Sequence, residues 1–165
     1  MLALRYVYVL ALVVWLGGMV VLGALVAPTT FQVLQAAAPE TGRALAGTLF
    51  GVMLARFHYL AYGAGAMLFV SLAVMAILGP RPAGFAIRMG IIAVMLGVAV
   101  YSGVVVLGEI ASIQKVVGTL PSTLTANDPY RLRFDQLHQL STRLMTFNIV
   151  AALALLYWEA REHGR

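Results

Sequence analysis

Two histidines and a carboxylate, His58, Glu109 and His138, are the side chains of this sequence best suited to chemistry. Imidazole and carboxylate groups can hold a metal ion or haem, and inside a membrane they can relay protons or ions. The sequence contains no cysteine, so disulfides, thiolate metal sites, iron–sulfur clusters and covalently attached haem are excluded. It also lacks a nucleophile elbow, a phosphate-binding loop, an HExxH motif and a dinucleotide-binding fingerprint. We therefore expect no enzymatic activity.

A stripe of polar side chains runs along the last helical segment of the chain. At 100° per residue its members lie within about 40–60° of one another, and Ser141 and Asn148 extend it. The members are Arg131, Asp135, His138, Thr142 and Met145. The spacing predicts one shared face of this helix, and ionisable side chains at this level usually face the bundle interior.

Three interpretations of the polar residues remain open. The first is a structural network, in which Glu109 pairs with Arg56 or Arg143. In the same network Asp135 orients the ring of His138. Ionisable groups near a membrane boundary often serve this role, because a paired charge faces the bundle interior at less cost than an unpaired one.

The second and third interpretations assign a ligand to the same residues. A metal or haem site would use His58 and His138 as ligands, with Asp135 or Glu109 supporting them. A proton or ion path would run through Glu109, His138 and Asn148. Both require the side chains to converge, which only a three-dimensional structure can show.

The composition indicates that lipid surrounds the elements that position these residues. Of the 165 residues, 62% are hydrophobic and only 10% are charged, and the mean hydropathy is +0.93. A soluble domain of this size could not bury so much apolar surface. The net charge of +5 comes from single Lys and Arg residues at the ends of apolar runs. This pattern is typical of membrane anchoring and argues against binding to nucleic acid.

Four apolar runs predict one antiparallel bundle of four transmembrane helices, a single domain that covers residues 1–165. The runs span residues 6–27, 57–78, 85–108 and 138–158, and each is long enough to cross a bilayer. The first run is too long for a cleavable signal peptide. A short GPRPAG turn at 79–84 joins the second and third runs.

The other two connections are about 29 residues long and carry helical periodicity. We therefore expect all four helices to continue beyond the bilayer at one end, by on the order of 15–20 Å. Counting about 20 residues along each helix from the opposite boundary reaches the level of His58, Glu109 and His138. The candidate site is thus expected at the base of this extension.

Glycines predict the packing seams of the bundle. On the third helix their spacings of seven and eleven residues return to the same face, and on the second helix a GxxxG motif begins the seam. The predicted packing positions are Gly47, Gly51, Gly65, Gly90, Gly97 and Gly108. Trp15 falls near the middle of the first run, so we expect it inside the bundle beside Gly17 and Gly18.

The numbers of Lys and Arg residues at the two ends of the bundle are nearly equal, so they hardly favour one orientation in the membrane. The end with both termini carries five Lys and Arg residues and the other end carries six. Because Arg5 lies directly before the first run, the positive-inside rule favours cytoplasmic termini. The expected location is the bacterial inner membrane.

Three segments resemble a known family: WLGGMVVLGALVAPTTF (15–31), GRALAGTLF (42–50) and RFDQLHQLSTRLMTFNI (133–149). The chain looks like the bacterial domain-of-unknown-function family grouped with eukaryotic transmembrane protein 205. Members of that family are small four-helix membrane proteins with a similar F-x-x-L-H-x-x-S segment. The resemblance covers nearly the whole chain, and it implies a fold more than a function.

The family is also distantly similar to copper-resistance and haem-linked membrane proteins. The haem-linked relatives carry a histidine in the first helix and this sequence has none there, so the resemblance supports a role chiefly for His138. We therefore expect an accessory or scaffold subunit of a larger membrane complex, with lipid and other subunits as partners. The alternatives are a metal-handling or efflux-related protein and a haem- or tetrapyrrole-binding subunit.

Overall fold

The computed structural model describes residues 2–118 and 120–163, and within these ranges every regular element is a helix. Two of the four long helices are interrupted by a π turn. The elements are α1 (Leu2–Val21), the π turn η1 (Leu22–Val26), α2 (Ala27–Ala37), α3 (Gly42–Leu78), α4 (Phe85–Val100), the π turn η2 (Tyr101–Val106), α5 (Leu107–Val117), the 3-10 turn η3 (Pro121–Thr123) and α6 (Pro129–His163). Because α1, η1 and α2 are continuous, and so are α4, η2 and α5, the chain folds as four long rods.

Each of the four rods is apolar and long enough to cross a membrane. In the part of the chain that is described they run over Leu2–Ala37, Gly42–Leu78, Phe85–Val117 and Pro129–Arg161, with 33–37 residues each. At 1.5 Å per residue these rods are roughly 50–55 Å long, against about 30 Å of hydrocarbon. The predicted four-helix membrane bundle with extended helices is confirmed, and the chain is an integral membrane protein.

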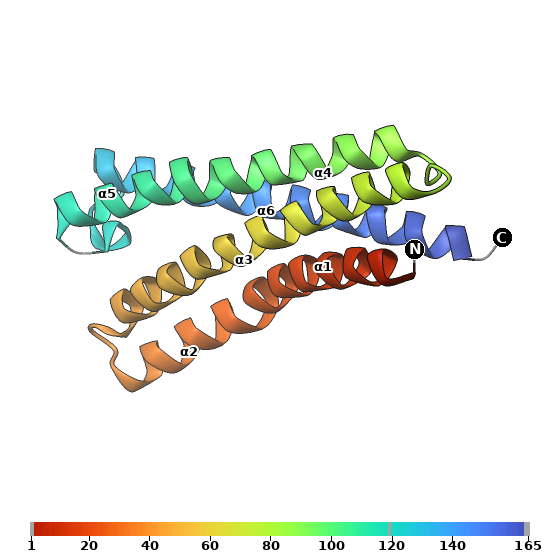
Figure 1. Cartoon of the computed structure of the whole chain (residues 1–165). Coiled ribbons are helices and arrows are strands. Elements are labelled where there is room, and N and C mark those ends of the chain that lie inside the picture. Colours follow the sequence, from red (N-terminus) through yellow and green to blue (C-terminus); the bar gives the residue numbers. More distant parts are fainter. Residues whose placement is uncertain (1, 119, 164–165) are drawn as a thin grey trace.

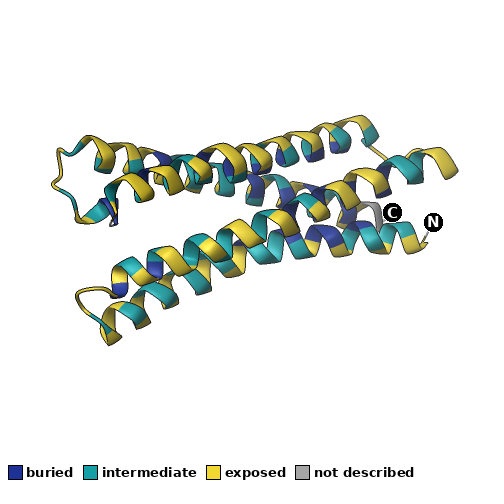
Figure 2. Cartoon of the chain, turned by 60° about the vertical axis from the view of Figure 1, so that its left-hand side comes forward, coloured by how far each residue is buried: buried dark blue, intermediate teal, exposed yellow. Residues whose placement is uncertain are grey.

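The rods lie antiparallel, with the two termini and the 79–84 turn at one end of the molecule (Figure 1). The connection at 38–41 and the described residues 120–128 lie at the other end. Near the termini α1 packs on α3 and α6, and α4 packs on α3 and α6. Towards the other end the α2–α3 hairpin and the α5–α6 hairpin diverge, as Figure 1 and Figure 2 both show. We call these two ends the closed end and the open end.

The hydrophobic core follows the same asymmetry. The large cluster of buried side chains lies in the closed half of the bundle and includes Tyr8, Trp15, Leu68, Met95 and Leu155. In the open half a small second cluster, formed by Val106 of η2, Ile113 of α5 and Leu137 of α6, joins the third rod to α6. Buried residues are dark blue in Figure 2 and are concentrated in the closed half. The closed half therefore supplies most of the packing that holds the four rods together.

Trp15 lies inside the bundle, with 1% of its surface exposed, as its position in the first run predicts. Its ring packs on Gly65 of α3 and not on Gly17, around which the space is open. A Cβ atom at Gly65 would lie 3.0 Å from the Trp15 ring and 2.8 Å from Leu96. Here the absence of a side chain lets α1, α3 and α4 approach closely.

The other predicted packing glycines divide into two groups. Gly47 meets Leu120, at 3.4 Å from an added Cβ, and so contacts the connection before α6. Around the remaining four the structure has open space within 4 Å of an added Cβ: Gly51, Gly90, Gly97 and Gly108. These four make no close packing inside the described chain, so their role in contacts with another molecule stays a prediction.

The π turn η2 also corrects the expectation that Gly108 shares a face with Gly97. A π turn takes up about one extra residue, roughly 100° of helical rotation. Because η2 spans Tyr101–Val106, the eleven residues between the two glycines no longer return to the same face. Residues seven or eleven positions apart share a helix face only where no π turn lies between them.

We predict that Gly65→Val destabilises the folded protein by about 1–3 kcal/mol, because two side chains of neighbouring helices would have to move. Gly63→Val is the matched control, since an added Cβ at Gly63 meets nothing within 4 Å. Thermal unfolding of the two purified variants in detergent measures the difference. Equal midpoints for both variants would show that Gly65 does not limit the packing.

Candidate functional site

The most deeply buried polar cluster described lies at the closed end, between α1, α4 and α6. Arg88 of α4 donates from Nη2 to Oε2 of Glu159 on α6, at 2.6 Å. Arg5 of α1 donates from Nε to Oε1 of the same carboxylate. The side chains of Arg88 and Glu159 are 1% and 5% exposed, and that of Arg5 is 32% exposed. We refer to Arg5, Arg88 and Glu159 as the ion cluster.

Aromatic side chains complete the surroundings of the ion cluster. The guanidinium carbon of Arg88 lies 4.8 Å from the centroid of the Tyr8 ring, which is fully buried. This cation–π contact stabilises a charge that has been removed from water. Tyr8 also belongs to the large hydrophobic cluster, so the ion cluster is continuous with the core.

Local sequence explains how the carboxylate is positioned. The turn before α4 ends at Gly84, whose φ of 62° is left-handed and favours glycine. A Cβ at Gly84 would overlap the ring of Trp158, the residue that precedes Glu159. The backbone amide of Arg88 donates to Gly84 at 2.9 Å, which begins α4 at this point. The turn before α4 therefore packs on Trp158 at the end of α6, and this contact places Glu159 next to Arg88.

The ion cluster has a structural function, because three helices converge on one carboxylate. An unpaired charge in an apolar interior is very costly, whereas a charge that is paired and hydrogen-bonded can be tolerated. The cluster therefore fixes the relative positions of α1, α4 and α6.

The sequence interpretation missed this cluster, although a signal was present. It treated the single Lys and Arg residues as membrane-anchoring charges, and Glu109 was the carboxylate that it chose for the candidate site. However, Arg88 lies four residues inside the third helix, where a charge requires a partner. Glu159 directly follows the Tyr157–Trp158 pair, at the same end of the bundle. Depth counting applied to charges of both signs would have paired them.

Glu109 pairs with Arg133, not with Arg56 or Arg143. Its two carboxylate oxygens accept hydrogen bonds from Nε and Nη2 of Arg133 at 2.6 and 3.0 Å. The pair joins α5 to α6 and is at the surface, with side-chain exposures of 35% for Glu109 and 51% for Arg133. The predicted partners were wrong because counting residues from the membrane boundary gives the depth of a side chain in the bilayer. It does not give the direction in which that side chain points from the helix axis.

His58 lies on α3 and faces the π turn η2. Its Nδ1 is 2.8 Å from the carbonyl oxygen of Leu54, one turn earlier on the same helix. Its ring makes an edge contact with Tyr62, whose hydroxyl donates to the carbonyl oxygen of Ala99 at 3.5 Å. Gly103 of η2 provides the space for both rings, because an added Cβ would overlap them. The histidine therefore packs the α3–α4 seam.

His138 and Asp135 lie on exposed parts of α6. The His138 ring stacks on Phe134, with centroids 6.3 Å apart. Asp135 lies opposite Arg131 on the same helix, with Nε and Oδ2 at 3.9 Å, and makes no hydrogen bond to His138. The predicted orienting contact is thus replaced by a pair within the helix.

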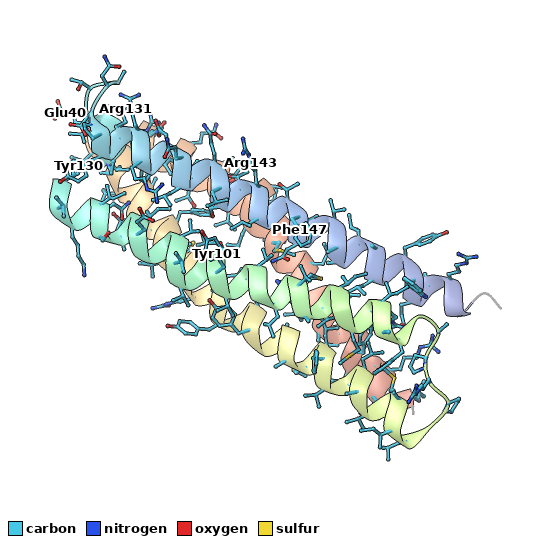
Figure 3. All side chains as sticks on the ribbon, turned by 90° about the horizontal axis from the view of Figure 1, so that it is seen from above. Glu40, Tyr101, Tyr130, Arg131, Arg143 and Phe147 are labelled. Carbon is cyan, nitrogen blue, oxygen red and sulfur yellow. The ribbon has the colours of Figure 1, made fainter. Side chains whose placement is uncertain are left out.

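The supporting residues take different positions around α6 and α3. The Thr142 hydroxyl donates to the His138 carbonyl at 3.0 Å, while Ser141 is half-buried. Arg56 is exposed. Arg143 is also exposed and projects away from the other helices (Figure 3). The stripe therefore does not converge on one neighbour.

Asn148 is the exception within the stripe. It is 5% exposed, and its Oδ1 atom is buried without a hydrogen-bond partner in the structure. Its neighbours Met145 and Ile149 on α6 pack against the large hydrophobic cluster, so Asn148 belongs to the closed half of the bundle.

No cluster of metal ligands occurs in the described part of the chain. Across residues 2–118 and 120–161, whose side chains are described, no three His, Asp or Glu side chains come close enough together to hold a metal ion. The role of His58, Glu109 and His138 as ligands remains a prediction.

The comparisons with known proteins identify a family. Residues 10–119, two thirds of the chain, match the family described as Domain of unknown function (DUF4149). The predicted membership in a domain-of-unknown-function family is confirmed at this level. The match begins within α1, continues through α5 and ends before α6, which carries His138. No curated protein and no solved structure matches the chain.

We predict that Glu159→Gln lowers the free energy of unfolding by about 3–5 kcal/mol, because Arg88 is left buried without its counter-charge. Thermal or denaturant unfolding in detergent micelles measures the loss. Glu109→Gln is the matched control: it removes the same charge from an exposed pair, so its effect should be much smaller. A comparable loss in both variants would contradict the structural role of the ion cluster.

Proposed function

The chain belongs to the DUF4149 family, and we propose that it acts as an accessory subunit docked on a larger membrane complex. The supporting observation is the apolar surface of the open end. Exposed apolar side chains occur there on every rod, and their exposed fractions are 57% for Val33, 54% for Leu45, 66% for Val116 and 50% for Leu132. Large exposed apolar surfaces mark interaction sites in proteins.

The lengths of the rods explain why lipid alone does not account for this surface. If the hydrocarbon begins near Tyr6, about 20 residues of α1 and η1 cross it and α2 projects beyond it. The α2 helix carries Gln32 and Gln35 beside Val33, and the following connection carries Glu40. This mixture of polar residues and exposed apolar residues suits contact with protein more than contact with acyl chains.

The outward glycines support the same proposal within the membrane. Gly90 and Gly97 lie on an exposed part of α4, seven residues apart and before the π turn, so they share a face. No other part of the described chain packs on that face within 4 Å of an added Cβ. Small residues allow a transmembrane helix of a partner to approach closely. A docked subunit would thus have contact surfaces both inside and outside the bilayer.

The metal-handling and haem alternatives have weaker support. Each needs His58 and His138 to act together. His58 faces the α3–η2 seam and His138 stacks on Phe134, so the two rings have different local partners. The accessory role uses surfaces that the fold presents without rearrangement.

The finer assignments from the sequence belong to the same proposal. The bacterial inner membrane, cytoplasmic termini and a relation to eukaryotic transmembrane protein 205 are consistent with a four-helix membrane protein of this family. With cytoplasmic termini, the open end would project from the opposite face of the membrane, where the partner would contact it.

We predict that a charge placed on the α2–α3 hairpin releases the partner. Val33→Glu should reduce the amount of stoichiometric partner recovered after cross-linking in native membranes by about tenfold or more, as for an interface anchor. Gln32→Glu is the control, because it adds the same charge at the neighbouring exposed polar position.

An accessory role also requires a specific partner in this experiment. The partner that is lost must be a defined membrane protein present in a fixed ratio to the wild-type chain. If wild-type protein is recovered alone from native membranes under mild detergent, the accessory role is contradicted.

A further inference from the structure

We propose that a water molecule binds inside the closed half of the bundle, between the side-chain amide of Asn148 on α6 and the indole N–H of Trp15 on α1. This inference is independent of the accessory role, because it concerns the interior of the bundle and not its surface. It rests on the hydrogen-bonding needs of two buried side chains and on the register between their helices.

Asn148 is a polar side chain enclosed by apolar ones. It is 5% exposed, and its Oδ1 atom accepts no hydrogen bond from the described residues. On the same face of α6, one and two turns further on, Ala152 and Leu155 are fully buried in the large hydrophobic cluster. A buried oxygen that has given up its contact with bulk water carries the full desolvation penalty unless a donor reaches it. Asn148 therefore needs a hydrogen-bond donor in an apolar part of the bundle.

The indole of Trp15 offers the complementary group. Trp15 is 1% exposed, and within the described residues its N–H donates no hydrogen bond. Buried tryptophans usually donate this N–H to a partner. The ring atoms that pack on Gly65 are Cζ3 and Cη2, which belong to the six-membered ring and not to the pyrrole edge that carries the N–H. The closed half thus holds a donor and an acceptor that both need a partner.

The hydrogen bond between Arg5 and Glu159 sets the register of α1 against α6 and so the level of these two groups. Along α1, Trp15 is 10 residues from Arg5, and along the antiparallel α6, Asn148 is 11 residues from Glu159. At 1.5 Å per residue both side chains lie about 15–17 Å from that hydrogen bond, near the middle of a hydrocarbon layer of about 30 Å. Because α1 packs on α6, the two groups lie at one level of neighbouring helices.

Water fits both groups better than any other molecule available at this depth. One water molecule can accept from the indole N–H and donate to Oδ1 at the same time. Lipid tails offer neither a donor nor an acceptor. Exposures of 1% and 5% leave no room for a partner helix or a lipid headgroup to reach Trp15 or Asn148. The bridge adds a directional link between α1 and α6 where the remaining contacts are apolar.

Water-edited solid-state NMR of the full chain in lipid bilayers, with isotope-labelled tryptophan, tests the proposal. The chain has two tryptophans, so the spectrum shows two indole signals, and Trp15→Phe assigns them. Half-buried Trp158, at the closed end, is the internal reference. We expect magnetisation from water to reach the Trp15 indole N–H in the wild-type protein, and Asn148→Leu to abolish this transfer at Trp15 alone. Leucine is close to asparagine in size but offers no hydrogen bond.

Thr142→Val is the matched control, because it removes a polar group from an exposed position of the same helix and should leave both indole signals unchanged. A second measurement guards against misfolding of Asn148→Leu: in protein with isotope-labelled asparagine, Trp15→Phe should reduce the transfer from water to the Asn148 amide. The proposal is overturned if the wild-type Trp15 receives no magnetisation from water while Trp158 does. It is also overturned if the transfer to Trp15 survives in Asn148→Leu, or if Trp15→Phe leaves the Asn148 signal unchanged.

Discussion

The carboxylate of Glu159 is the constraint on which the arrangement of the bundle depends. In an apolar interior it can be ionised only if cations surround it, and the fold supplies one from α1 and one from α4. Hydrophobic packing between helices in lipid has little directional preference, because lipid tails are as apolar as the side chains. A shared carboxylate with two guanidinium partners specifies which helices meet and at what height. The packing of Trp15 on Gly65 then joins α3 to the same end.

Among the described residues, the two hairpins at the open end share no ion cluster like that of the closed end. The charged pair of the open end, Glu109 with Arg133, joins α5 to α6, which already belong to one hairpin. The second hydrophobic cluster is likewise confined to the third rod and α6. Between the hairpins, Leu120 meets the small surface at Gly47 of α3. The hairpins therefore diverge, and their apolar side chains remain exposed (Figure 2).

The fold could be predicted from the sequence because it depends on the order and the length of the apolar runs along the chain. A run of about 20 apolar residues is sufficient to define a membrane crossing. The site was harder to predict, because pairing depends on direction around each helix. The π turns η1 and η2 each change that direction by about one residue, and no propensity marks them in advance. Glu109 therefore reached Arg133 and not the two arginines expected from depth, and Gly108 left the face of Gly97.

The ion cluster at the closed end is connected to the open end by a continuous rod. Glu159 of α6 accepts hydrogen bonds from Arg5 of α1 and from Arg88 of α4, so it fixes the position of α1 against α6. Because α1 continues through η1 into α2, a change at this end can be transmitted along a continuous helix to the hairpin that we propose contacts the partner.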